Sequence, residues 1–176
     1  VNFTRWEKRH LPEENEAPKI VVVGNESRGF VDSLEFLIKQ NALRIEGELV
    51  EFQYFENSRK DEAREMLKNK GAQLVYVLPN SSFTPREINE LTESAVVFGE
   101  GRGFVTEKGG DVSFVTVRNR VKLVVSEKYF RRTSPKLSSK LVNLKSVVEI
   151  IPSDGPKGPT GRRGPNSLPV DLPLPR

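Results

Sequence analysis

The sequence K-I-V-V-V-G at residues 19–24 decides the fold class. It is a run of β-branched residues with no alternation of polar and apolar side chains, which is typical of a strand buried on both faces of a parallel sheet. Apolar residues at helical spacing follow at once and predict an amphipathic helix over 30–42. A buried strand leading directly into a helix is the repeating unit of an α/β domain.

The same alternation continues along the chain. Further strands are predicted at 49–55, 74–78 and 95–99, with helices at 59–70 and 85–94 between them. Two more strands, 111–117 and 120–126, are separated by two residues and predict a tight antiparallel hairpin. The predicted fold class is therefore α/β: a doubly wound, mostly parallel sheet with a C-terminal antiparallel hairpin and helices on both faces.

The two ends of this domain are less regular. Ser126 is a predicted N-cap for a short helix over 127–133. Apolar residues then recur at helical spacing and predict a last helix that runs to about residue 149, namely Leu137, Leu141, Leu144 and Val148. At the other end, the apolar and aromatic residues 1–7 are expected to be the end of an element that starts before Val1.

Composition divides the chain into two parts. Residues 1–151 form the predicted α/β domain, whereas residues 152–176 hold 7 of the 12 prolines and are expected to be an extended or disordered tail. Four Gly-X-Y triplets at 155–166 are too few for a stable collagen helix. The last stretch, S-L-P-V-D-L-P-L-P-R, has the composition of a polyproline-type ligand.

Composition also excludes several function classes. The absence of cysteine excludes a disulfide, a cysteine zinc site and a thiol nucleophile, and the single histidine, His10, lies in a charged connector. We therefore predict no enzyme activity, no cofactor and no metal site. Of the formal net charge of +4, the tail supplies half, so a nucleic-acid partner is not expected. No segment reads as a membrane helix or a signal peptide, so an export signal is expected to have been removed or to lie outside the chain.

Three polar segments, at 24–27, 80–82 and 99–103, are predicted to meet at the carboxyl edge of the sheet, where open α/β folds bind ligands. The stretch G-N-E-S-R-G-F at 24–30 lacks the glycine spacing of a dinucleotide loop or a P-loop, and it also fits a plain strand-to-helix turn. Glycines and an arginine in G-E-G-R-G at 99–103 fit either an anion site or a flexible connection. The candidate residues for binding a ligand or a partner are Gly24, Asn25, Ser27, Asn80, Ser81 and Arg102.

Two other patterns have competing interpretations. A phosphoreceiver would need acidic residues at the ends of the first and third strands, but Asn25 and Asn80 stand there. The basic residues of 128–145 fit either a solvated surface or a contact with an acidic partner.

Three motifs, in this order along the chain, together resemble one family: F-T-R-W-E at 3–7, G-G-D-V-S-F-V at 109–115 and L-S-S-K-L-V-N-L at 137–144. The chain resembles the YfiR-like family of bacterial periplasmic proteins over about residues 3–148. It departs from the family pattern at Glu7, where a proline is usual, and in lacking the cysteines that tie the best-known members to redox state. The resemblance also implies that the first helix of the family is truncated before Val1.

The resemblance implies a non-enzymatic periplasmic regulator. The best-known member holds an inner-membrane diguanylate cyclase inactive by contact, and its release raises cyclic di-GMP and favours biofilm. An inner-membrane sensor or cyclase is thus the implied partner. The alternative function, a domain that binds a small ligand such as a nucleotide or amino acid, stays open on the candidate edge residues. A homodimer paired through an exposed edge of the hairpin is a further expectation.

Overall fold

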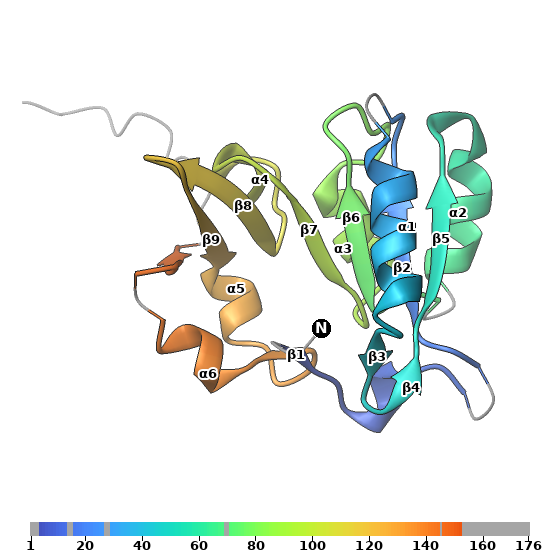
Figure 1. Cartoon of the computed structure of the whole chain (residues 1–176), viewed down its shortest axis with the longest axis horizontal. Coiled ribbons are helices and arrows are strands. Elements are labelled where there is room, and N and C mark those ends of the chain that lie inside the picture. Colours follow the sequence, from blue (N-terminus) through green and yellow to red (C-terminus); the bar gives the residue numbers. More distant parts are fainter. Residues whose placement is uncertain (1–3, 14–15, 27–28, 69–70, 145, 153–176) are drawn as a thin grey trace, which may run out of the picture.

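A computed structural model of the chain describes residues 4–13, 16–26, 29–68, 71–144 and 146–152. These residues form one seven-stranded mixed sheet with helices on both faces (Figure 1), which confirms the predicted fold class. From edge to edge, the strands are β11 (Val148–Ile151), β9 (Arg120–Ser126), β8 (Val112–Val117), β7 (Val96–Glu100), β6 (Leu74–Val77), β2 (Lys19–Val23) and β5 (Glu51–Phe55).

The strands β5, β2, β6, β7 and β8 are mutually parallel, and within this sheet β8 and β9 form an antiparallel hairpin. The predicted turn at Arg118 and Asn119 is confirmed, since both residues have positive φ angles of 49° and 60°. Such angles match the type I′ geometry that favours a two-residue hairpin loop. The helices are α1 (Phe30–Gln40), α2 (Lys60–Lys68), α3 (Pro85–Leu91), α4 (Gly103–Thr106), α5 (Glu127–Phe130) and α6 (Ser139–Val142).

Short elements complete the described part. They are the strand pairs β1 (Thr4–Arg5) with β10 (Lys136–Leu137) and β3 (Arg44–Ile45) with β4 (Glu48–Leu49), and the 3-10 turns η1 (Lys8–His10) and η2 (Asn57–Arg59). Residues 4 and 5, expected to end an element, thus pair antiparallel with a segment more than 130 residues away.

Local signals start two of the helices. In α3, the Thr84 side chain accepts a hydrogen bond from the Glu87 amide at 3.2 Å, and the Glu87 carboxylate accepts one from the Thr84 amide at 2.6 Å. This capping box satisfies amides that the first turn leaves unpaired. Ser126 accepts from the Tyr129 amide at 3.1 Å and so caps α5, as predicted.

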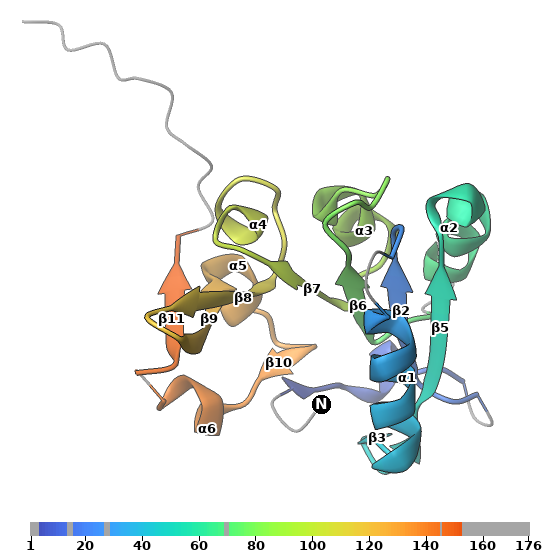
Figure 2. The ribbon, with the colours of Figure 1, turned by 45° about the horizontal axis from the view of Figure 1, so that its top comes forward.

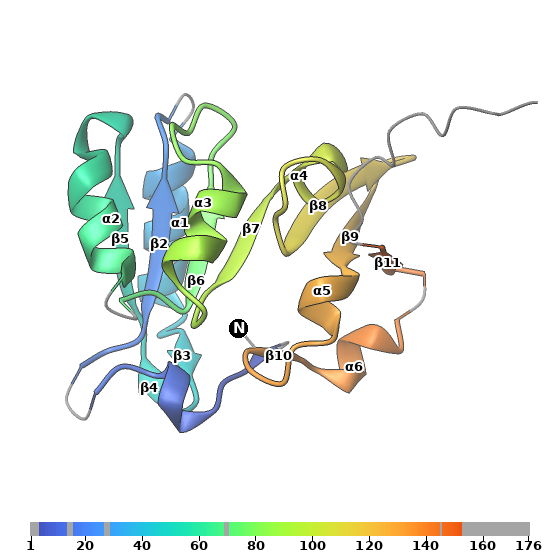
Figure 3. The same cartoon turned by 180° about the vertical axis from the view of Figure 1, so that it is seen from behind.

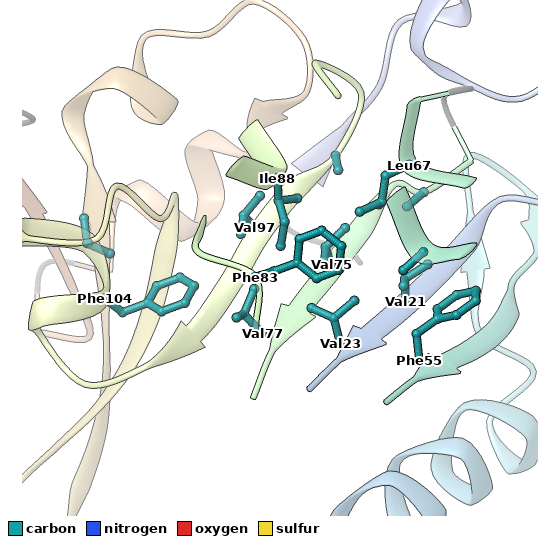
Figure 4. Packing of buried hydrophobic residues seen from close by; sticks show 14 of the residues in the cluster. Val21, Val23, Phe55, Leu67, Val75, Val77, Phe83, Ile88, Val97 and Phe104 are labelled. Atoms are coloured by element: carbon teal, nitrogen blue, oxygen red, sulfur yellow. The ribbon is translucent and has the colours of Figure 1, made fainter. Parts of the chain in front are cut away.

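Helices α2, α3 and α4 cover one face of the sheet, which is the near face in Figure 3. Figure 4 shows this core, in which alternate residues of β2 and β6 meet apolar side chains of the helices. Helix α1 packs on the opposite face, through Val31 and Ile38, and Figure 2 shows it in front of the sheet. Val21 and Val23 face the core under α2, α3 and α4, whereas Ile20 and Val22 face the core on the α1 side. Both faces of β2 are therefore buried, which explains why the run at 19–24 has no polar alternation.

The predicted helix from 137 to 149 is wrong. Leu137 belongs to β10, α6 has only four residues, and 148–151 form β11, which pairs in parallel with β9. The helical spacing arises because Leu137, Leu141 and Val148 belong to separate segments that each return to the same core. Strand β11 also overturns the expected exposed hairpin edge, because it occupies that edge along 123–126. The homodimer stays a prediction without this support.

The predicted boundary at residue 151 coincides with the end of β11. Apart from Pro152, the predicted tail lies outside the described residues.

Candidate functional site

The structure brings four of the predicted edge residues together. Asn57, just after the carboxyl end of the edge strand β5, joins the loops that follow β2 and β6: its amide donates to Asn25 Oδ1 at 3.0 Å, and its side-chain nitrogen donates to the Asn80 carbonyl at 2.7 Å. Its side-chain oxygen accepts from the Ser82 amide at 2.7 Å. Gly24 packs directly on Ser81. The polar atoms of this edge therefore hold the loops to one another, a role for Asn57 that sequence reasoning missed.

Gly24 is fixed in this edge by its backbone and its neighbours. Its φ angle is +120°, and a Cβ atom there would lie 2.9 Å from Ser81 Cα. We expect Gly24→Ala to lower the free energy of unfolding by about 1–2 kcal/mol, because strain and overlap add. Urea denaturation followed by Trp6 fluorescence measures this, with Gly29→Ala as the control, since Gly29 also has a positive φ but a Cβ added there would have no atom within 4 Å. Equal losses in both variants would show that packing on Ser81 contributes nothing.

Arg102 has a different environment. Its guanidinium forms a bidentate ion pair with Glu149 on β11, with distances of 2.8 and 2.6 Å, and this pairing raises its pKa. The same contact lowers the pKa of Glu149. Arg102 thus ties the loop after β7 to the last strand. Ser27 lies outside the described residues, and the ligand-binding role of these six residues stays a prediction.

A larger feature lies on the face of the sheet that carries α1. An apolar groove with a volume of about 1010 Å³ runs over β6, β7, β8 and β9. Phe30 and Leu34 of α1 line one side, and Leu137 and Leu141 line the other. Helix α4 packs on the opposite face after β7, and within the described residues α1 is the long helix on the groove side (Figure 1). We call this feature the front groove.

Aromatic rings form much of the front groove. Tyr76 and Phe98 line it from β6 and β7, and Phe114 stacks on Phe98 with ring centroids 6.1 Å apart. Phe30 lies against Tyr76 with centroids 5.1 Å apart. Large side chains remain accessible here, since Val121 is 61% exposed. Contiguous exposed apolar surface of this kind marks an interaction site.

One polar group marks the carboxyl end of the groove. The Tyr76 hydroxyl donates a hydrogen bond to Glu100 at 2.7 Å, and Glu100 is exposed. Burial, with the hydrogen bond and negative charge of Glu100, raises the pKa of Tyr76 above its ordinary value. The phenol therefore remains a neutral donor, and the carboxylate keeps an open side for a positively charged group.

Sequence reasoning missed the front groove, although a signal was present. Strand β8 carries apolar residues on both faces, with Val112 and Phe114 on one and Val115 on the other, as a strand with two covered faces would. The sequence prediction assigned no helix or other element to cover the apolar residues on the groove face of β8.

Among the side chains of the described segments, no three acidic, histidine or cysteine residues cluster in a way that could hold a metal ion. The same segments contain no helix with the length and apolar character needed to cross a bilayer.

The family model described as YfiR/HmsC-like matches residues 1–145. The chain belongs to the YfiR/HmsC-like family. Comparison with curated proteins finds no match. The YfiR/HmsC-like family is regulatory and non-enzymatic, and its members are in general periplasmic proteins that act with signalling partners.

The structure explains why two motifs of the YfiR/HmsC-like pattern matter here. Trp6 is buried, and its indole N–H donates to the Ser94 carbonyl at 2.9 Å, which fastens the N-terminal segment to the start of β7. In the G-G-D motif, Gly110 lets the Phe104 ring approach, and Asp111 is buried in a polar cluster. These motif residues build the fold, and the front groove lies beside them.

Proposed function

We propose that this protein is a periplasmic, non-enzymatic regulator that controls a membrane signalling protein, such as a diguanylate cyclase, by direct contact through the front groove. Membership of the YfiR/HmsC-like family supports the regulatory class. The observation that carries the proposal is the open apolar groove with Phe98, Phe114 and Val121 on its surface. Residues that contribute most to protein–protein affinity are aromatic and aliphatic side chains that become buried from water in a concave patch on binding.

The groove suits a protein partner better than the candidate edge does. At the edge, the side chains of Asn25 and Asn57 and the backbone carbonyl of Asn80 form hydrogen bonds between the loops themselves. In the groove, apolar groups lack cover, and Glu100 offers a single charged contact at one end. A partner with an apolar segment that begins near a lysine, an arginine or a helix N-terminus would match both features.

Val121→Asp tests the contact. Val121 is 61% exposed and lines the groove, so a charge there changes the surface with little effect on folding. We expect the affinity for the periplasmic region of the host's partner cyclase to fall at least about tenfold, as measured by biolayer interferometry with each cyclase of the host in turn. Binding by the unmodified chain to none of them would refute the cyclase assignment.

Phe36→Asp is the matched control. Phe36 is 62% exposed on α1 and does not line the groove, so the variant loses an exposed apolar residue and gains the same charge elsewhere. Its affinity should equal that of the unmodified chain. Equal losses in the two variants would mean that the partner responds to net charge and not to the groove.

A further inference from the structure

The hairpin of β8 and β9 extends beyond the rest of the sheet. Strand β8 pairs with β7 only through residues 112–114, and β9 pairs with β11 only from Leu123 onward. Residues 115–122, which we call the hairpin tip, therefore form a two-stranded ribbon that pairs with no third strand of the described residues. Figure 1 shows the two strands reaching away from β6 and β7. Because residues 116–121 are all exposed, the tip presents both faces of the ribbon to its surroundings.

The hairpin tip carries an excess of positive charge. Strands β8 and β9 and their turn contain Arg118, Arg120 and Lys122 and no aspartate or glutamate. Within the described residues, the side chains of Arg118 and Arg120 form no ion pair. Glu149, whose charge interacts with that of Lys122, is already held by Arg102 in two hydrogen bonds. The tip therefore has cations available for a negatively charged partner.

The geometry of the turn does not account for the arginine at its first position. Arg118 has a φ angle of 49°, a left-handed conformation that glycine and asparagine adopt at lower cost. The side chain extends from the outermost part of the ribbon, where within the described residues it packs on no core. A cation at this strained position is therefore better explained by a contact outside the chain than by folding.

Apolar side chains accompany these cations on both faces of the tip. Val121 lies opposite Thr116 in the strand register, and Val117, the next residue of β8, points to the other face. Val117 is 39% exposed, and Val121 is more exposed still. Long cationic side chains lay their methylene groups along apolar surface while their charged ends stay in water. Valines beside cations at one projecting end thus match the boundary between lipid headgroups and acyl chains.

A lipid surface fits the hairpin tip better than a protein does. Stable protein interfaces bury about 800 Å² on each partner, far more than two valines and a turn supply. An anionic membrane needs no complementary shape, because each lysine or arginine near its surface adds to the attraction and apolar burial adds to it further. The charge and the small size of the tip therefore both favour a membrane.

We propose that the hairpin tip docks on an anionic lipid surface. The side chains of Arg118, Arg120 and Lys122 lie among the lipid phosphates. Val117 and Val121 lie at the outer ends of the acyl chains. The contact would concentrate the protein at a membrane, where the partner of its proposed function is found. It rests on the hairpin and does not depend on the front groove or on the identity of that partner.

Vesicle co-sedimentation of the full chain tests the docking. We expect the chain to bind vesicles of equal parts phosphatidylcholine and phosphatidylglycerol at least about tenfold more tightly than vesicles of phosphatidylcholine alone. Arg118→Gln with Arg120→Gln should lower the affinity for the anionic vesicles at least about tenfold, because two cations leave the lipid surface. Higher salt should weaken the binding of the unmodified chain, since it screens this attraction.

Lys136→Gln with Lys140→Gln is the matched control. It removes the same charge from two exposed residues of β10 and α6, beyond the other end of β9 (Figure 1). Its affinity for the anionic vesicles should stay within about twofold of that of the unmodified chain. Equal losses in the two double variants would overturn the proposal, because the vesicles would then respond to net charge. Equal binding of the unmodified chain to both kinds of vesicle, or to neither, would overturn it too.

A second measurement reports whether the tip enters the lipid. Because the chain contains no cysteine, Val117→Cys can be labelled with bimane, and Ser139→Cys on α6 serves as its control. With anionic vesicles, the emission of bimane should shift to the blue at residue 117 and stay unchanged at residue 139. An unchanged emission at both residues would overturn the docking of the tip. If the two arginine substitutions lower the affinity for the partner cyclase but not for vesicles, the tip is a protein contact instead.

Discussion

Replacing Arg132 with methionine is expected to lower the free energy of unfolding by about 3–4 kcal/mol at pH 8, because it leaves a buried carboxylate without its cation. Asp111 is 1% exposed, and Arg132 Nη2 lies 3.3 Å from its Oδ1. The guanidinium also donates to the Ala95 carbonyl at 3.4 Å and to Asn89 Oδ1 at 3.3 Å. One side chain thus joins the loop after α5 to α3 and to the start of β7.

The pH dependence identifies the cause. Burial raises the pKa of Asp111 above its ordinary value of 3.8, and Arg132 and the Val97 amide oppose this rise. Without Arg132, the folded-state pKa of Asp111 rises further. Stability from a raised pKa is present below the unfolded value and is lost as pH rises through the folded value. The loss caused by Arg132→Met should therefore be largest at pH 8 and should shrink toward pH 4.

The neighbouring residue provides the control. Arg131 is 74% exposed in its side chain and pairs with Glu127 on the surface. Arg131→Met removes the same charge and should change stability by less than about 0.5 kcal/mol. Urea unfolding at pH 8 and pH 4, followed by the single tryptophan, measures both variants. A loss for Arg132→Met that is the same at both pH values would exclude an unpaired Asp111 carboxylate as its cause.

The second large effect is expected at Phe104. Its ring is 6% exposed and lies between two glycines: a Cβ at Gly99 would meet it at 2.2 Å, and one at Gly110 would meet it at 2.1 Å. Phe104→Ala should cost about 3–5 kcal/mol, because the ring leaves a cavity in the core that Figure 4 shows. Gly110→Ala should cost about 2–3 kcal/mol by forcing the ring out of place.

A double variant separates this packing from a general intolerance of Gly110 to substitution. In the double variant Phe104→Leu with Gly110→Ala, the smaller leucine side chain makes room for the new methyl group. The loss of unfolding free energy in the double variant should therefore be less than the sum of the losses in Phe104→Leu and Gly110→Ala alone. Thermal unfolding of the four proteins completes the cycle. Additive losses would show that Gly110 is required for its backbone and not for the ring of Phe104.

The sequence alone determined the parallel half of the sheet and the hairpin. The valines of β2 read as a doubly buried strand, and Thr84, Ser126 and the turn at 118–119 are signals within a few residues of the structure they specify. The family resemblance likewise rested on local motifs, and the family match confirms it. Signals of this range survive in the sequence because each acts on the backbone beside it.

Only the tertiary structure decided the last strand and the front groove. Strand β11 forms because its backbone pairs with β9, which lies over 20 residues earlier in the sequence. The spacing of Leu137, Leu141 and Val148 predicted a helix, although these residues belong to separate segments that pack in one core. The rings of Phe30, Tyr76, Phe98 and Phe114, which line the groove, come together only when α1, β6, β7 and β8 have packed. Contacts between residues distant in sequence produce no periodic pattern in the sequence. They form only when the elements pack together in the folded chain.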